Sequence, residues 1–185
     1  MMVADLVGKQ LQILNEIVPR LFRGAILWNP SNPSNGPQLA HAQEAARTLG
    51  MQVLPIDARA SDAIEVAFAT MSRENAQAVI VLVDSMLVAD RVRIAALAAR
   101  GRLPAMYGLT EHVRAGGLMA YGVNVADLYR RAATYVDKIL RGARPADLPV
   151  EQPTTFELVI NRKTATALGL AIPLPLLQRA EQVIE

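Results

Sequence analysis

Two clusters of hydrogen-bonding residues follow segments that have the composition of buried strands. The run NPSNPSN, residues 29–35, comes directly after the apolar segment GAILW at 24–28. A second apolar segment, AVIVLV at 78–83, is followed by DS. Amides and hydroxyls donate and accept hydrogen bonds, and a carboxylate accepts them from cations such as ammonium. We therefore predict a binding site for a small polar molecule, formed by Asn29, Asn32, Ser34, Asn35, Asp84 and Ser85.

The helix expected at about 37–49 begins immediately after the first cluster. Its first backbone N–H groups have no partner within the helix, and the helix dipole places partial positive charge there. Pro37 lies in the first turn, where proline is favoured. This helix end suits a carboxylate and Asp84 suits an ammonium group, so the predicted ligand is amino-acid-like.

Two Tyr-Gly pairs extend the predicted site. Tyr107 and Tyr121 end two further apolar segments, at 103–107 and 117–121, and Gly108 and Gly122 follow them. Ligands of open α/β sheets bind outside the carboxyl ends of the strands. We therefore expect both pairs to contribute to the same pocket.

These residues also have simpler interpretations, which the sequence leaves open. Asn, Pro and Ser are common turn formers, although the loop is longer than the roughly 2 to 6 residues of most βα connections. Asp84 can cap the next helix together with Ser85, and both tyrosines can belong to the core. His41 and His112 are expected to face solvent rather than to bind a metal.

Short apolar segments alternate with amphipathic helical patterns over residues 1–123. This alternation predicts right-handed βαβ crossovers and a three-layer α/β lobe with an open, doubly wound parallel sheet. We expect the flavodoxin-like strand order 2-1-3-4-5, in which the first and third strands flank the binding crevice. Strands are expected at 24–28, 53–56, 78–83, 103–107 and 117–121, and helices at 3–18, 37–49, 61–74 (opened by Ser61), 86–100 and 110–115.

Residues 124–185 have a different pattern. A long amphipathic helix is expected at about 125–141, followed by a Pro-rich connector and a strand within 154–160. A short helix capped by Asn161 and a terminal helix at 172–185 complete the chain. We interpret this region as an addition to the five-stranded lobe rather than as a second complete domain.

Composition narrows the possible partners. The 185 residues are 52% hydrophobic and 4% aromatic, which suits a core of aliphatic side chains. A net charge of +2 without a basic block argues against nucleic acid, and the absence of cysteine excludes disulfides and thiolate sites. No run approaches the roughly 18 apolar residues of a membrane span, and the first residues lack a signal-peptide pattern.

Catalytic and cofactor templates are missing from the sequence. There is no GxGxxG after the first strand, no Walker-type loop and no GxSxG elbow. No spacing of residues suits a metal. We therefore expect no cofactor, no metal and no catalysis. An enzyme that uses Asp84 as a base is the interpretation that the sequence supports least.

Several segments resemble the carboxyl-terminal half of ABC transporter substrate-binding proteins of the tryptophan-binding type. The most specific are the strand followed by Asn-Pro, the segment GGLMAYG at 116–122 and the segment DLPVEQPTTFELVIN at 147–161. The resemblance covers almost the whole chain. It implies a type I periplasmic-binding fold, in which two similar lobes enclose the ligand in a cleft.

The resemblance also implies a function and a location. Such proteins work outside the cytoplasm and deliver a solute to an ABC permease. A complete member has a secretion signal and an amino-terminal lobe, which we do not expect in this chain. The apolar face of helix 125–141 then needs another partner, and we expect a homodimer through this helix and the tail. A sensory or structural domain that no longer closes on a ligand is the alternative.

Overall fold

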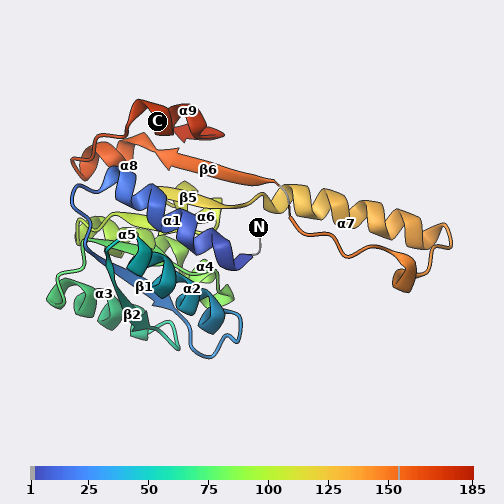
Figure 1. Cartoon of the computed structure of the whole chain (residues 1–185), viewed down its shortest axis with the longest axis horizontal. Helices are drawn as coiled ribbons and strands as arrows, with labels where there is room; N and C mark the ends of the chain where they lie inside the picture. Colours follow the sequence, from blue (N-terminus) through green and yellow to red (C-terminus); the bar gives the residue numbers. More distant parts are fainter. Residues whose placement is uncertain (1–2, 154) are drawn as a thin grey trace.

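The computed structural model describes residues 3–153 and 155–185, and these residues form one seven-stranded sheet (Figure 1). Its parallel part has the predicted order 2-1-3-4-5. The strands of that part are β2 (Gln52–Asp57), β1 (Arg23–Trp28), β3 (Ala78–Val81), β4 (Ala105–Tyr107) and β5 (Met119–Val123). Two more strands continue the sheet: β6 (Phe156–Asn161) pairs antiparallel with β5, and β7 (Gln182–Ile184) pairs parallel with β6. The predicted open α/β sheet is confirmed, and it is wider than predicted.

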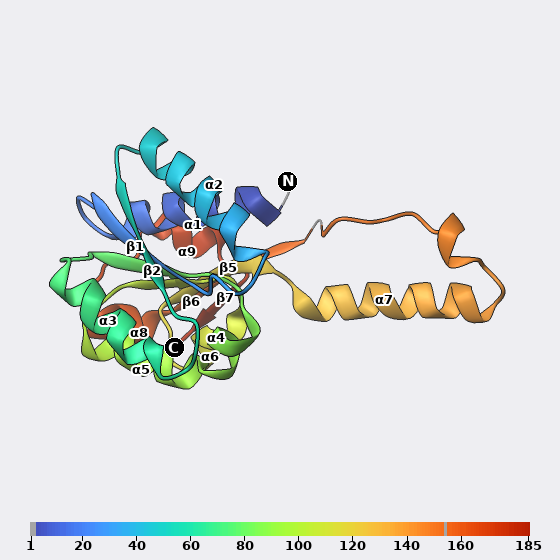
Figure 2. The ribbon, with the colours of Figure 1, turned by 90° about the horizontal axis from the view of Figure 1, so that it is seen from below.

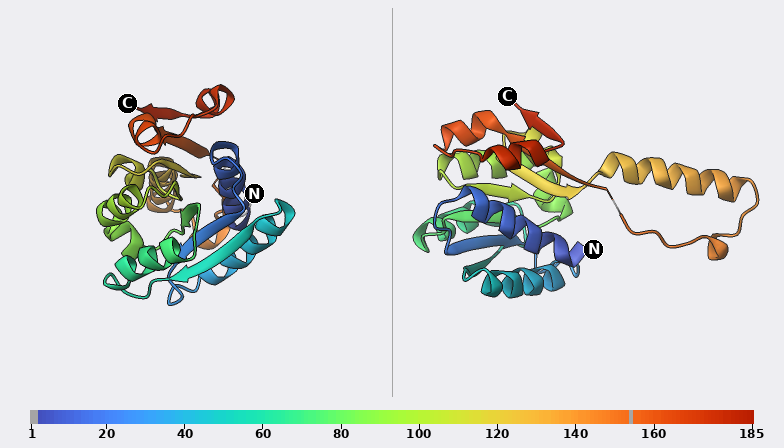
Figure 3. Two further views of the ribbon diagram at one scale, coloured as in Figure 1. Left: turned by 90° about the vertical axis from the view of Figure 1, so that its left-hand side faces the viewer. Right: turned by 45° about the horizontal axis from the view of Figure 1, so that its top comes forward.

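Helices cover both faces of the sheet (Figures 2 and 3). One face is covered by α1 (Val3–Ile17), α2 (Asn35–Thr48) and α9 (Leu174–Arg179). The other is covered by α3 (Ala63–Arg73), α4 (Ser85–Ala89), α5 (Arg91–Arg100) and α6 (Thr110–Arg114). A short helix, α8 (Arg162–Ala167), packs beside β7.

Successive side chains of the inner strands enter opposite cores. Ile26 and Ile80 pack on the side of α1 and α2, whereas Leu27 and Val81 pack on the side of α3 and α5. All four are at most 1% exposed. Burial on both faces explains why the sequence of these strands is continuously apolar. Each such side chain contributes about 1.5–3 kcal/mol of burial free energy.

Three predicted helices differ from the observed ones. Residues 86–100 form two helices, α4 and α5, with a break at Asp90. The break lets α4 bury Leu87 and α5 bury Ile94 against the same core. Helix α3 starts two residues after Ser61, whose carbonyl instead accepts a hydrogen bond from Arg93 at 2.9 Å.

The third difference lies at the end of the chain. Only Leu174–Arg179 of the predicted terminal helix is helical, and the chain then becomes extended at Ala180 and forms β7. Val183 pairs with Ile160 of β6 in the sheet. The β-branched residues Val183 and Ile184 favour this strand. Asn161 caps α8 as predicted, since its Oδ1 accepts a hydrogen bond from the N–H of Thr164 at 3.0 Å. Residue 154 of the predicted strand lies outside the described residues.

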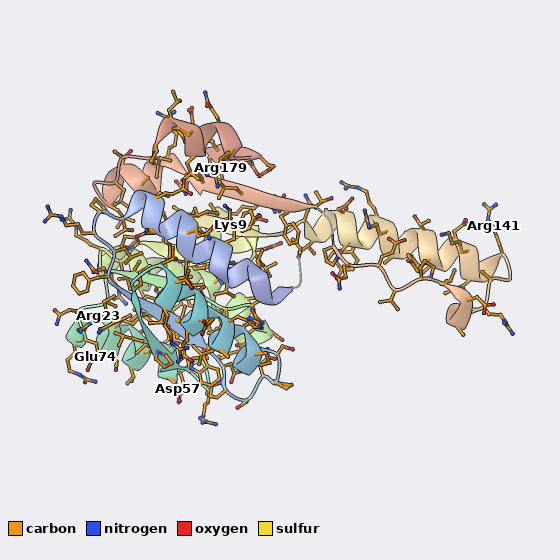
Figure 4. All side chains as sticks on the ribbon, viewed as in Figure 1. Lys9, Arg23, Asp57, Glu74, Arg141 and Arg179 are labelled. Atoms are coloured by element: carbon orange, nitrogen blue, oxygen red, sulfur yellow. The ribbon has the colours of Figure 1, made fainter. Side chains whose placement is uncertain are left out.

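Helix α7 (Val125–Leu140) leaves the sheet after β5 and projects from it as an arm (Figure 2). The chain turns through a 3₁₀ helix, η1 (Pro145–Asp147), and runs back beside α7 to β6. The hydroxyl of Tyr135 donates to the carbonyl of Pro149 at 2.7 Å and joins the two limbs. Arg141 lies at the far end of the arm (Figure 4). The structure describes every residue of α7 and none of them is buried.

Candidate functional site

The loop after β1, residues 29–35, is shaped by its own asparagines. Asn35 is fully buried, and its Oδ1 accepts a hydrogen bond from the N–H of Asn29 at 3.1 Å. Its Nδ2 donates to the carbonyl of Val83 at 3.0 Å. The Oδ1 atoms of Asn29 and Asn32 accept from the backbone N–H groups two residues further on, at 2.9 and 3.0 Å. These Asx turns give the loop a defined shape and fix it to the end of β3.

Asp84 joins the carboxyl ends of β1 and β3 and is 6% exposed. Its Oδ2 accepts from the Nδ2 atoms of Asn29 at 3.3 Å and of Asn32 at 3.0 Å. Its Oδ1 accepts from the N–H groups of Met86 at 2.9 Å and of Leu87 at 3.3 Å, so Asp84 does cap α4. Four donors fill about all the lone pairs of a carboxylate. Direct binding of a solute ammonium would require one of these bonds to be released.

A cavity of about 410 Å³ lies beside this loop, at the carboxyl ends of β3 and β4. Five of the predicted site residues line it: Asn32, Ser34, Asp84, Ser85 and Gly108. Its apolar wall comes from α1, β3, β5 and the base of the arm, and consists of Leu6, Val7, Val81, Leu82, Val83, Leu109, Val123, Leu128 and Pro153. Gln10 and Gln38 complete the lining.

The other predicted residues do not line the cavity. Asn29 and Asn35 support the loop. Tyr107 is the last residue of β4, and its side chain lies in the core on the side of α3 and α5. Tyr121 is half-buried on the α1 side of β5, where its ring stacks on Phe156 at 6.2 Å between centroids. Burial, and secondarily the Glu181 carboxylate, raises the pKa of its hydroxyl. The structure thus brings half of the predicted set to one cavity.

Gly108 and Gly122 are required by close packing at the ends of β4 and β5. A Cβ atom on Gly122 would overlap the carbonyl oxygen of Gly108. A Cβ atom on Gly108 would overlap a methyl group of Val83. The two glycines therefore keep the rim of the cavity compact, and only Gly108 lines it directly.

Gln10 is a cavity residue that the sequence analysis missed. It lies on the buried side of α1, between Leu6 and Leu14, and is 2% exposed. Its Nε2 donates to the carbonyl of Tyr121 at 2.7 Å. A polar residue in the apolar stripe of an amphipathic helix was the available signal, because burial of an amide costs free energy unless it is hydrogen-bonded.

Residues 3–184 match the family model described as ABC transporter substrate binding protein. The chain belongs to this family. Its fold is similar to that of an ABC domain from Streptococcus pneumonia solved in complex with L-Trp, with 24% identity, a TM-score of 0.89 and coverage of 97% of this chain and 60% of that one. A conserved domain protein from Vibrio cholerae has 23% identity and a TM-score of 0.88, over 96% of this chain and 60% of that one.

A third solved relative is a substrate-binding protein with adhesive properties from Clostridium difficile, in its ligand-free, open form. It has 20% identity and a TM-score of 0.73, over 96% of this chain and 59% of that one. No curated protein matches the chain. This family member therefore spans about 60% of the length of the solved relatives that it resembles.

This family member also contains a buried pair of rings. Tyr107 and His112 stack with centroids 4.6 Å apart and planes 15° from parallel, and both are at most 2% exposed. Burial raises the pKa of Tyr107 well above its usual range. Burial also lowers the pKa of His112, against weaker opposing effects of nearby carbonyls and of Glu111. The expectation that His112 faces solvent is wrong, since α6 turns its ring onto Tyr107, whereas His41 is exposed as expected.

Among the described residues, no group of three or more His, Cys, Asp or Glu side chains is arranged to hold a metal. Within the same residues, none of the helices combines the length and the apolar character that crossing a bilayer would need. The cavity beside loop 29–35 is lined by the predicted polar residues Asn32, Ser34, Asp84 and Ser85.

Proposed function

We propose that this chain is the solute-binding component of an ABC transporter, or its carboxyl-terminal lobe, and that it recognises an amino acid or a similar small polar solute for uptake. The observation that carries the proposal is the position of the cavity at the carboxyl ends of β3 and β4, beside the loop after β1. The loop after β1 and the end of β3, which both line the cavity, flank the switch point of this open α/β sheet, where ligands of such folds bind.

The chemistry of the cavity suits an amino acid with an apolar side chain. The polar rim, with Asn32, Ser34 and Ser85, offers an amide and two hydroxyls, and the amino terminus of α2 offers partial positive charge to a carboxylate. The remaining lining is mainly aliphatic and suits an apolar group. The complex of the Streptococcus pneumonia domain with L-Trp supports this class of ligand.

The family supports two further parts of the proposal. The solute passes to an ABC permease as the protein partner, and the protein works outside the cytoplasm, in the periplasm or anchored to a membrane. Recognition without chemical change is expected, because the family is one of binding proteins.

The arm supports self-association as a separate proposal. Helix α7 exposes Val136, Ile139 and Leu140 at 55%, 40% and 82%. A groove of about 420 Å³ runs between α7 and residues 145–153. Such apolar surface is rarely left uncovered. We expect two copies to cover each other's arms, in a homodimer through α7 and the tail.

Native mass spectrometry of the purified chain tests both proposals in one spectrum. An added mass in the range of an amino acid, together with chemical-shift changes of Ser34 and Ser85 on titration with that compound, would support solute binding. A chain that carries no small molecule and responds to no amino acid would favour the alternative, a sensory or structural domain without ligand closure. A monomer at all concentrations would contradict the homodimer.

A further inference from the structure

Gln10 has one hydrogen-bonding group that the protein does not use. Its Nε2 donates to the carbonyl of Tyr121, which can only accept a hydrogen bond, so the amide nitrogen must face that carbonyl. The amide oxygen, Oε1, is then fixed on the other side of the group. This oxygen accepts no hydrogen bond from any residue that the structure describes.

The free oxygen belongs to a side chain that is both buried and part of the cavity. Gln10 is 2% exposed, and it lines the cavity together with Leu6, Val7 and Gly108. The free oxygen itself is not fully buried and is reached by solvent. A solute that brings a donor to Gln10 can replace that solvent at an acceptor that lines the cavity and is already oriented by Tyr121.

Other acceptors of the cavity are less suited to the same task. The carboxylate of Asp84 already receives four donors. The Oδ1 of Asn32 accepts from the N–H of Ser34 at 3.0 Å. Gln38 also lines the cavity, but it lies on the more exposed flank of α2, where water competes for its amide oxygen.

We propose that Gln10 is a specificity-determining residue of this site and accepts a hydrogen bond from the ammonium group of an amino-acid solute. This inference rests on the proposed function. It assigns to Gln10 the role that the sequence suggested for Asp84, and it leaves Asp84 to hold loop 29–35 in place. It also predicts that the solute's ammonium lies near β5 and α1, opposite the carboxylate-binding end of α2.

Two variants separate ligand contact from support of the fold. Gln10→Met keeps the size of the side chain and removes both hydrogen-bonding groups. Gln10→Lys keeps a donor for the carbonyl of Tyr121 and removes the acceptor, because an ammonium group accepts no hydrogen bond. Gln12→Met, on the exposed side of the same helix, is the matched control, and Gln38→Met tests the other glutamine of the cavity.

The probes are two amino acids and their deaminated counterparts, each titrated into the full chain by NMR: L-tryptophan with 3-indolepropionate, and L-leucine with 4-methylpentanoate. For the amino acid that the unaltered chain binds, Gln10→Met should weaken affinity about tenfold, the usual effect of losing a hydrogen bond to a charged group. Affinity for the deaminated counterpart should change less than about twofold, since its missing ammonium makes no such bond. Gln10→Lys should bind the deaminated compound more tightly than the amino acid, and Gln12→Met should resemble the unaltered chain.

An equal loss for both members of a pair, or no loss for either, would overturn the role of Gln10 while the proposed function stands. Binding of neither amino acid by the unaltered chain would overturn the amino-acid function and this inference with it. Urea unfolding of each variant, measured alongside, shows whether a loss of affinity follows from a loss of stability.

Discussion

Two regions differ in how their side chains are partnered: the cluster formed by loop 29–35 with Asp84, and the arm formed by α7 and residues 145–153. In the cluster, Asn29, Asn32, Asn35 and Asp84 bond to one another and to backbone groups, so a polar region is completed within the chain. In the arm, Val136 and Leu140 stay more than half exposed, so an apolar region is left incomplete. The difference indicates that the cluster is complete within the chain, whereas the arm leaves apolar side chains exposed, and these are the side chains that we propose a second copy covers.

The largest effect is expected from Gly122→Val, at the compact rim beside the cluster. The new side chain would overlap the carbonyl oxygen of Gly108, and the chain can relieve this only by moving β4 and β5 apart. We expect a loss of at least about 3 kcal/mol in the free energy of unfolding. Urea denaturation followed by circular dichroism measures it. Gly36→Ala is the control, because a Cβ atom there meets nothing within 4 Å; equal stability of both variants would contradict the packing argument.

Asp84→Ala should have the next largest effect, since it removes the centre of the cluster. The amides of Asn29 and Asn32 and two N–H groups of α4 would lose their acceptor, at an expected cost of about 2–4 kcal/mol. Asp62→Ala is a matched control, because Asp62 is the N-cap of α3 yet its side chain makes no capping bond to a described residue. Hydrogen exchange should also show faster exchange over 29–35 in Asp84→Ala. Unchanged protection of residues 29–35 in that variant would show that the loop does not depend on Asp84.

His112 should make the stability of the lobe depend on pH. Burial holds its pKa in the folded protein below the ordinary value of about 6.5, so the unfolded chain binds the proton more readily. Stability is therefore fully present above about pH 6.5 and falls as the pH is lowered below it. The groups acting on the ring are the carbonyls of Leu87 and Leu109, the carboxylate of Glu111 and the guanidinium of Arg91.

Urea denaturation at pH 7.5 and 5 measures this dependence. In His112→Phe, which keeps a ring against Tyr107, the loss of stability between these two pH values should be smaller than in the unaltered chain. The exposed His41→Phe should leave the loss unchanged. A His112→Phe protein with the original pH dependence would show that other groups cause it.

The smallest effect on stability is expected from Val136→Asp in the arm. The valine is 55% exposed, and none of the residues of α7 is buried. The free energy of unfolding of the sheet region should therefore change by less than about 0.5 kcal/mol. Its effect should appear instead in the oligomeric state. Size-exclusion chromatography with light scattering should show a dimer for the unaltered chain and a monomer for the variant. Thr134→Asp, which is also exposed and lies about 160° around the helix from Val136, serves as a control for added charge.

Parts of the fold that depend on local sequence pattern could be predicted. The continuous apolar runs of β1 and β3 reflect burial on both faces, and the position of the polar loop follows from strand order alone. β7 could not be predicted, because Gln182–Ile184 becomes a strand only by pairing with β6. His112 was misassigned because its burial depends on how α6 packs over β4, which no local pattern encodes.

The site shows the same limit. Asn32, Ser34, Asp84, Ser85 and Gly108 reach the cavity because each follows a strand end, a position that topology predicts. Gln10 reaches it from a helix that precedes the first strand, and its partner Tyr121 lies 111 residues away. Which acceptors were free could not be inferred either, since the use of Asp84 by two asparagines is a property of the folded loop.

The two limbs of the arm join the sheet through one strand pair. β5 and β6 are neighbours, paired up to Val123 and Phe156, and Asn124 binds both the start of α7 and the carboxylate of Glu157 at 2.8 Å. Both limbs of the arm are therefore attached to the sheet at one place, around Asn124. The arm's 16-residue helix is about 24 Å long, so a tilt of about 10° at Asn124 moves the tip by about 4 Å. Leu128 and Pro153 would move less in such a tilt, because they lie near the attachment point. Both form part of the cavity wall. A tilt of the arm would therefore displace this part of the cavity wall by less than it displaces the tip.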